Sequence, residues 1–372
     1  MLVDRLRGQT TKRSADAVGA AFEIETVVIG GPGHDNEQAI RDGASARLPN
    51  RRPGWSWSRI IGAMSAGTEP EDERGSLRCP ACRGNAFIRR SVLPDLTTSE
   101  CRACGLILSR IERTAPAIPE FALVDQPAYV RSVGASRRRQ AQDILDRLID
   151  RVSPGAKLLD VGCSFGFFLQ AAREVGFKIE GIEPDPDAGA YARRLLGDDV
   201  VHQGLLDIDL ARSTSADIVS TLDVIEHIRI EEHLAFAEMI RTVLEPAGIW
   251  VIKVPSSEGL YYKLSDLLLR AYPSLGAGLV RRMWQTRYEY PHLTYFSLRS
   301  LSLWLDRFGF DVIGHRYLPE VPPGTVIDRL TTDGDIGRAK AYLAAPAVLG
   351  VNMLDRLRGK SDALVMFARP RA

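Results

Sequence analysis

The sequence predicts an α/β fold in which a parallel sheet carries helices on both faces and a small metal-binding ribbon precedes the sheet. Strand and helix patterns alternate from residue 135 onward, and most of the strands read as apolar runs, which predicts the sheet. Two pairs of closely spaced cysteines before residue 112 predict the ribbon.

The length and charge of the chain limit the classes of protein that it can be. With 372 residues, of which 45% are hydrophobic, the chain can build one large core and smaller attachments. The 48 basic and 47 acidic side chains leave a net charge of +1, which argues against nucleic acid as a partner. No run of about 18 apolar residues and no apolar signal segment occurs, so we expect a cytoplasmic protein without a membrane span. The oligomeric state stays open.

Residues 1–75 contain few regular patterns, and we expect them to be weakly ordered. Met64 lies shortly before the first cysteine pair. This position suggests the hypothesis that translation starts there and that residues 1–63 do not belong to the native protein.

Four of the five cysteines form two Cys-x-x-Cys pairs separated by 18 residues, namely Cys79-Pro-Ala-Cys82 and Cys101-Arg-Ala-Cys104. This spacing is typical of tetrahedral zinc held by four thiolates, and a redox pair is the alternative. Four cysteine ligands leave no open coordination position, so the ion would be structural. We therefore predict a zinc ribbon over residues 76–112 and a linker over residues 113–134.

The following elements alternate in type. Apolar residues recur every three or four positions over residues 135–152, which predicts a helix. Ser297 is a suitable N-cap for a helix that ends at Gly309. Further helices are predicted up to residue 175, over 188–196 and 231–244, and after 336. Strands are predicted over residues 157–162, 178–183, 200–203, 217–222, 248–254, 311–316 and 363–369.

Residues 255–295 read as a long irregular insert with many aromatic side chains. We interpret it as a lid over an acceptor pocket, because aromatic side chains suit a sugar ring or an aromatic acceptor. Arg281, Arg282 and Arg287 lie within the insert and would suit a diphosphate. An ordinary amphipathic helix is the alternative interpretation.

The first strand of the sheet is followed by small residues in the pattern Asp160-Val-Gly162-Cys163-Ser164-Phe-Gly166. Small residues let the backbone turn sharply and approach a ligand closely. Glu183 ends the next strand, where an acidic side chain accepts hydrogen bonds from ribose hydroxyls. Asp160 would repel a pyrophosphate but would tolerate a sulfonium, so the pattern favours S-adenosylmethionine over a dinucleotide.

These motifs make residues 135–317 resemble the class I S-adenosylmethionine-dependent methyltransferases, whose fold is a Rossmann-like sheet with helices on both faces. The resemblance rests on five segments in order, which are 159–166, 181–185, 220–227, 244–248 and 292–297. The chain looks most like the small-molecule branch of that superfamily. The zinc ribbon together with His292-Leu-Thr-Tyr-Phe-Ser297 resembles sugar C-methyltransferases, although only residues 298–372 follow, where those enzymes carry a sizeable extra domain.

The resemblance implies positions for S-adenosylmethionine. Asp160, Gly162 and Gly166 would line its methionine part, and Glu183 would bind the ribose. Asp207 would contact the adenine amine, and Leu222 and Asp223 would lie beside the adenosyl group. Cys163 and Ser164 occupy the remaining loop positions, and we interpret Cys163 as a small filler rather than a catalytic group.

Methyl transfer to a hydroxyl or a carbon requires a group that aligns the acceptor and removes a proton. His227 follows the fourth strand at the edge where ligands bind, and His292 lies between the insert and a predicted helix. Either is a candidate base, and a structural hydrogen bond or lid packing is the alternative. Tyr295 is a candidate for positioning the acceptor.

The sequence therefore predicts an S-adenosylmethionine-dependent methyltransferase that acts on a sugar, a nucleotide-sugar or a secondary metabolite. A zinc-ribbon RNA methyltransferase and a non-catalytic binding module remain as alternatives. The segment Leu222-Asp-Val-Ile225 lacks the Asn/Asp-Pro-Pro-Tyr pattern of base-amino methylation, which argues against RNA.

Overall fold

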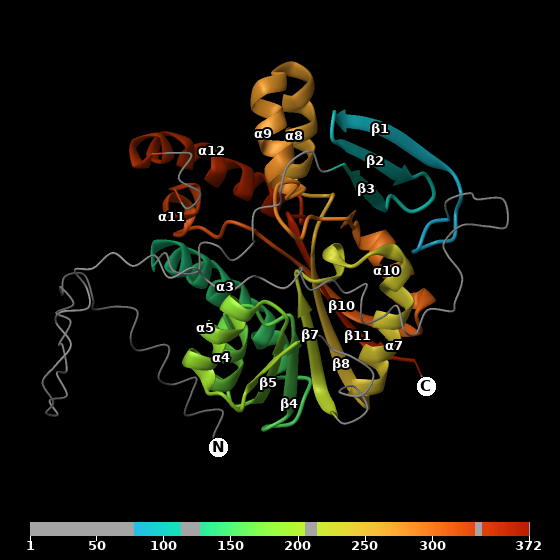
Figure 1. Cartoon of the computed structure of the whole chain (residues 1–372), viewed down its shortest axis with the longest axis vertical. Helices are drawn as coiled ribbons and strands as arrows, with labels where there is room; N and C mark the ends of the chain where they lie inside the picture. Colours follow the sequence, from blue (N-terminus) through green and yellow to red (C-terminus); the bar gives the residue numbers. More distant parts are fainter. Residues whose placement is uncertain (1–77, 113–126, 205–213, 332–336, 372) are drawn as a thin grey trace, which may run out of the picture. The chain divides into compact units, whose positions relative to one another are not determined.

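The computed structural model describes residues 78–112, 127–204, 214–331 and 337–371, which all belong to one compact unit of the chain. The predictions for residues 1–75 and for Asp207 lie outside the described residues. Figure 1 labels the elements that the following paragraphs use.

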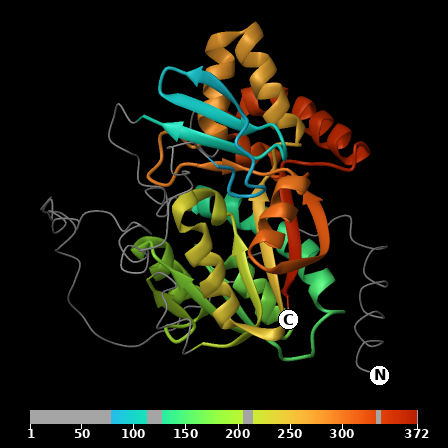
Figure 2. The same ribbon diagram turned by 90° about the vertical axis from the view of Figure 1, so that its right-hand side faces the viewer.

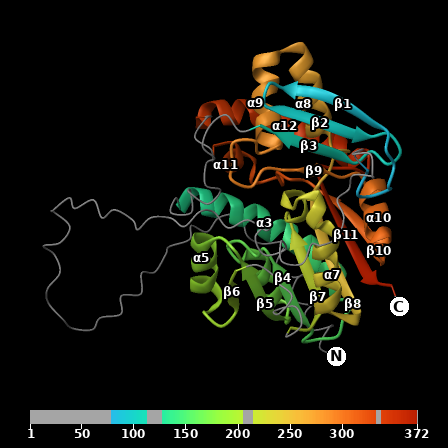
Figure 3. The same cartoon turned by 45° about the vertical axis from the view of Figure 1, so that its right-hand side comes forward.

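The cysteine pairs flank a small antiparallel sheet. Its strands are β1 (Phe87–Leu93), β2 (Leu96–Cys101) and β3 (Ile107–Ile111), and a fourth strand, β9 (Thr294–Tyr295), joins β3 from far along the chain. Figure 3 shows β9 beside β3. The predicted ribbon is therefore present, and its sheet is completed by the segment that contains the His292 motif.

The large sheet has the strand order β10-β11-β8-β7-β4-β5-β6. Its strands are β4 (Lys157–Val161), β5 (Lys178–Glu183), β6 (Val201–Gln203), β7 (Ala216–Leu222), β8 (Leu244–Pro255), β10 (Phe310–Leu318) and β11 (Ala363–Pro370). Neighbours from β6 to β8 are parallel, whereas β11 is antiparallel to both β8 and β10. The chain starts at β4, moves outward to β6 and returns to β7, so the strand order reverses between β4 and β7.

Helices cover both faces of this sheet (Figure 1). One face packs against α3 (Pro127–Leu148), α4 (Phe167–Glu174) and α5 (Pro186–Leu196), and the other against α7 (His233–Val243) and α10 (Leu298–Arg307). Side chains alternate between the two cores along the strands: Leu158 faces α3 and α4, whereas Leu159 faces α7. The predicted fold class is confirmed.

The insert differs from the expectation of an irregular segment. It forms two helices, α8 (Leu260–Ala271) and α9 (Pro273–Met283), which pack on one another as a hairpin beside the ribbon strands (Figure 2). Pro273 accounts for the error, because proline is compatible with the first turn of a helix and here begins α9 rather than ending all helical structure.

Two other boundaries differ from the sequence-based expectations. Helix α3 begins at Pro127, inside the stretch that was expected to be linker, and again a proline occupies the first helical turn. After β10 the chain forms α11 (Val326–Thr331), which was not predicted, and then α12 (Arg338–Leu357) and β11, which match the predicted helix after residue 336 and the last strand. Among the described residues, no helix is both long enough and apolar enough to span a membrane.

Candidate active site and metal centre

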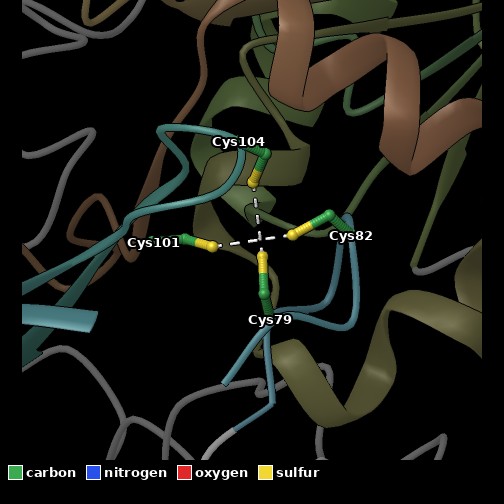
Figure 4. A group of neighbouring side chains, drawn as sticks. All are labelled: Cys79, Cys82, Cys101 and Cys104. Atoms are coloured by element: carbon green, nitrogen blue, oxygen red, sulfur yellow. Dashed lines mark hydrogen bonds between the residues drawn. The ribbon is translucent and has the colours of Figure 1, made fainter. Parts of the chain in front are cut away.

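The four ribbon cysteines point toward a common centre (Figure 4). The Sγ atoms of Cys79 and Cys104 are 3.5 Å apart, as are those of Cys82 and Cys101, and all four lie within 4.8 Å of one another. Sulfurs around a tetrahedral zinc with bonds of about 2.3 Å are about 3.8 Å apart, so the cluster fits this ion. All four thiols are free of disulfides, and they fill the coordination shell without an open position.

The ribbon is joined to the large domain by both apolar and polar contacts. Leu106 and Leu108 share a buried core with Trp304 of α10. Ser109 of β3 donates its backbone N–H to the Leu293 carbonyl at 2.9 Å and its hydroxyl to the His292 carbonyl at 2.8 Å. The ribbon therefore holds the backbone on which His292 lies.

Arg281, which the sequence suggested for a diphosphate, serves the same junction. Its two terminal nitrogens donate to the carboxylate of Asp95 in the β1–β2 turn at 2.5 and 2.8 Å. This ion pair lowers the pKa of Asp95. The expected role of Arg281 is therefore wrong, because its guanidinium is occupied by the ribbon; Arg282 does line the cavity described next.

A cavity of about 580 Å³ lies at the carboxyl ends of β4, β5, β7 and β8. Open α/β sheets bind ligands at this edge, beside the point where the strand order reverses. Most of the residues predicted from the sequence line it, namely Asp160, Gly162, Cys163, Ser164, Glu183, Leu222, Asp223, His227, His292 and Tyr295. Gly166 is not among the lining residues.

The loop after β4 turns through left-handed backbone. Gly162 has φ 78°, Ser164 has φ 50° and Gly166 has φ 77°. A Cβ on Gly162 would lie 2.8 Å from Val224, and one on Gly166 would lie 2.8 Å from Leu196. Gly166 thus lets α4 pack closely, whereas Gly162 shapes the cavity wall itself.

Two buried carboxyls, Asp160 and Glu183, lie beside this loop. The Ser220 hydroxyl donates to Asp160 at 2.7 Å, while Glu183 accepts the backbone N–H groups of Ser164 and Asp185 at 2.7 and 2.8 Å. Burial raises the pKa of each carboxyl to about 7, against the opposing effect of these hydrogen bonds. Glu183 is thereby fixed in orientation at the tip of β5, as ribose recognition requires.

Asp223 follows β7 and is held by two cations. Lys253, only 1% exposed, approaches its two carboxylate oxygens at 2.9 and 2.8 Å, and Arg137 of α3 also contacts it. Burial opposes ionisation, but the positive charges of Arg137 and Lys253 outweigh it and hold the pKa of Asp223 well below its usual range. Lys253 also contacts Glu320 at 3.1 Å.

His227 and His292 come together in the folded chain, with ring centroids 5.0 Å apart. Burial lowers the pKa of both; that of His292 falls to about 3, with His227 as the second cause. Both imidazoles are therefore neutral at pH 7. Glu226 is fully buried beside them, and burial followed by the charge of Asp223 raises its pKa well above the usual range.

The two remaining candidates have structural surroundings. The Tyr295 hydroxyl donates to the Met283 carbonyl at 2.9 Å, and its ring packs on Trp284 and Tyr262 at 4.6 and 4.9 Å between centroids. Tyr295 therefore forms cavity wall, and its hydroxyl is engaged by α9. Cys163 is 5% exposed, and burial raises the pKa of its thiol, as expected of a small filler.

Sequence reasoning missed Glu226, Lys253 and Arg137. Glu226 had a signal, because it adjoins His227 in the quoted motif. Lys253 lies inside an apolar strand, where a lone lysine indicates a buried partner. Arg137 lies in the run Arg137-Arg138-Arg139 of α3, and nothing in its local sequence indicates Asp223.

Residues 133–315 match a family model described as a methyltransferase domain. Over 126 residues the chain is 32% identical to a dTDP-3-amino-3,4,6-trideoxy-alpha-D-glucopyranose N,N-dimethyltransferase of Streptomyces venezuelae, a match that covers 32% of this chain and 51% of that protein. Over 110 residues it is 29% identical to a ubiquinone biosynthesis O-methyltransferase of Xanthomonas campestris pv. campestris, covering 28% and 45%. The chain thus spans about half the length of these relatives.

Among solved structures, the cyclopropane synthase MmaA2 of Mycobacterium tuberculosis is similar with a TM-score of 0.45 and 14% identity. The match covers 68% of this chain and 90% of that one.

The buried carboxyls predict how stability depends on pH. A carboxyl whose pKa is higher in the folded than in the unfolded chain stabilises the fold at pH values below its unfolded pKa, and this contribution is lost as the pH rises toward about 7. Asp160→Asn keeps an acceptor for Ser220 but removes the titration. Between pH 5 and 8 we expect the stability of the variant to fall less than that of wild type, by about 2 to 3 kcal/mol, which is the part of the shift from 3.8 to about 7 that lies in this range.

Urea unfolding of the ligand-free protein at pH 5, 6, 7 and 8 measures this difference. Asp150→Asn, at an exposed position after α3, is the matched control and should follow the wild-type profile. Parallel profiles for wild type and Asp160→Asn would show that Asp160 does not titrate in this range.

Proposed function

Because residues 133–315 form a class I S-adenosylmethionine-dependent methyltransferase domain, we propose that the protein transfers a methyl group from S-adenosylmethionine to a hydroxyl or carbon of a small molecule. One observation carries the proposal. A single cavity is lined both by the glycine loop with Glu183 and by the cluster of Glu226, His227 and His292.

The cofactor binds against the loop and the tips of β4, β5 and β7. Glu183 accepts hydrogen bonds from the ribose hydroxyls, since both of its oxygens keep a lone pair after accepting one backbone N–H each. The positive sulfonium lies near Asp160. Burial raises the pKa of this carboxyl to about 7, and the opposing effects of Ser220 and Arg137 do not cancel the rise. Gly162 provides the close backbone approach, and Asp207 and Leu222 are assigned to the adenine side.

The acceptor binds beside Glu226, His227 and His292. In the reaction, the acceptor oxygen or carbon forms the new bond to the methyl carbon, the sulfur–methyl bond breaks with its electron pair going to sulfur, and the acceptor loses one proton. The pKa of about 3 makes the neutral His292 a hydrogen-bond acceptor but a weak base. We therefore assign acceptor activation to the three side chains together.

The acceptor is a sugar, a nucleotide-sugar or a secondary metabolite with a comparable ring. Tyr261 and Tyr290 supply aromatic surface to the cavity, and Arg282 of α9 and Arg329 of α11 supply positive charge for an anionic substituent. One relative is named for a dTDP-amino-sugar and another for ubiquinone biosynthesis, which supports a small-molecule acceptor.

The ribbon binds one structural zinc ion and fixes the acceptor side of the cavity. The four cysteines, which leave no open coordination position, support the zinc ion. The two hydrogen bonds of Ser109 to the His292 segment support the positioning role of the ribbon. The apolar side chains of the ribbon are used in packing against the domain, which favours this structural role over a grip on RNA.

A substitution of His292 should impair methyl transfer without affecting cofactor binding. We expect His292→Ala to lower kcat by about 100-fold or more, because the acceptor loses part of its activating group, while the Kd of S-adenosylmethionine stays unchanged. Radiolabelled methyl transfer across a panel of sugars, nucleotide-sugars and phenols, with calorimetry for the cofactor, measures both. His315→Ala, at an exposed position of β10, is the control. Full transfer by His292→Ala would contradict the assignment.

Loss of zinc should act on the acceptor side alone. Purified protein should contain one zinc per chain, and Cys79→Ser with Cys104→Ser should remove it. Because the His292 backbone then loses its support, we expect kcat to fall about 10- to 100-fold with the cofactor Kd retained. Elemental analysis, calorimetry and methyl transfer test this expectation.

Cys163→Ala is the control for the zinc content, because it removes the only cysteine outside the cluster. A zinc-free variant with undiminished turnover would show that the ribbon does not support the acceptor side.

A further inference from the structure

Three residues that could bind a metal come together in the wall of the cavity. In the sequence they lie far from the ribbon cysteines. Glu226 and His227 lie in the short 3-10 turn η1 (Ile225–His227) after β7, and His292 lies two residues before β9. One ligand atom of each residue lies within 4.8 Å of the others. All three residues line the cavity.

Each histidine keeps one ring nitrogen available for a metal. Nδ1 of His227 lies 3.0 Å from the Pro291 carbonyl, which can only accept, so Nδ1 carries the proton and Nε2 keeps its lone pair. Nδ1 of His292 is buried and has no hydrogen-bond partner among the described residues. Metal-binding histidines typically donate their second N–H to a backbone carbonyl or carboxylate.

The carboxylate of Glu226 supplies the third ligand. The side chain is 0% exposed, and neither of its oxygens has a hydrogen-bond partner among the described residues. Arg137 and Lys253 act on Glu226 through their charge, but both form their ion pairs with Asp223 and not with Glu226. A buried carboxylate without a partner is costly, and a divalent cation would offset that cost directly.

We propose that Glu226, His227 and His292 bind one divalent first-row transition-metal ion, separate from the zinc of the ribbon. Two imidazole nitrogens and one carboxylate favour such an ion over Mg²⁺ or Ca²⁺, which prefer oxygen ligands. Three protein ligands leave coordination positions open toward the cavity.

The role of the ion rests on the proposed function. An open position beside the methyl donor would bind an oxygen atom of the acceptor and lower the pKa of its hydroxyl. The O–H proton leaves to solvent, the oxygen forms the new bond to the methyl carbon, and the electron pair of the sulfur–methyl bond stays on sulfur.

Mn²⁺ is the probe, because it is detected by electron paramagnetic resonance and competes poorly for a site of four thiolates. Full-length protein is freed of metals, loaded with one equivalent of Zn²⁺ for the four thiolates, and then titrated with MnCl₂. We expect one bound Mn²⁺ per chain, with affinity lowered at least 10- to 100-fold in Glu226→Gln and in His292→Ala. The matched control is Glu320→Gln, which removes a carboxylate from the same cavity outside the ligand set.

Hyperfine coupling to the nitrogen nuclei of histidine tests the wild-type protein without any substitution. The proposal predicts coupling from imidazole nitrogen to the bound Mn²⁺. Absence of that coupling, absence of Mn²⁺ binding, or equal binding by wild type and both variants would each overturn the site.

Two further measurements separate this proposal from the proposed function. In the first, loosely bound metals are removed and methyl transfer is measured with and without added Mn²⁺. If the enzyme binds S-adenosylmethionine and methylates its acceptor equally well in both cases, the activating role of the ion is overturned and the methyltransferase assignment stands. If Mn²⁺ binds as predicted but S-adenosylmethionine does not bind, the proposed function fails and the metal site stands.

Discussion

Buried negative charge at the carboxyl edge of the parallel sheet is the constraint on which the site depends. Four of the acidic side chains that line the cavity are Asp160, Glu183, Asp223 and Glu226. Asp223 forms ion pairs with Arg137 and Lys253, whereas burial raises the pKa values of the other three carboxyls. A ligand that brings positive charge and hydroxyl donors suits such a wall, and S-adenosylmethionine brings both.

The second constraint is the pairing of β3 with β9, which joins the ribbon to the segment of the cavity wall that we propose as the acceptor side. Because the backbone of His292 receives the Ser109 hydroxyl and the side chain of Tyr295 packs between α9 and the ribbon, neither residue has its position set by the large sheet alone. The cofactor side is different, since β4, β5 and β7 build it directly. A protein made this way can lose its acceptor site while it keeps its cofactor site.

Features that depend on a local sequence pattern could be predicted from the sequence. The succession of strands and helices along the chain, the glycine loop, Glu183 at a strand end and the four cysteines follow from periodicity and spacing. The Ser297 cap is present with its hydrogen bond to Ser300. The α8–α9 hairpin was missed because Pro273 can begin a helix as well as end one. The ion pair of Asp223 with Arg137 and that of Arg281 with Asp95 join residues 86 and 186 positions apart, which no local pattern encodes.

The most direct test of the account is the binding of S-adenosylmethionine, measured by calorimetry on wild type, Gly162→Ala and Gly155→Ala. Both glycines have nearly the same left-handed φ, 78° and 77°, but only at Gly162 does a Cβ meet a neighbour, Val224 at 2.8 Å in the cavity wall. Wild type and Gly155→Ala should each bind one S-adenosylmethionine per chain with saturation. Gly162→Ala should bind it clearly more weakly. No saturable binding by wild type, or equal binding by all three proteins, would contradict it.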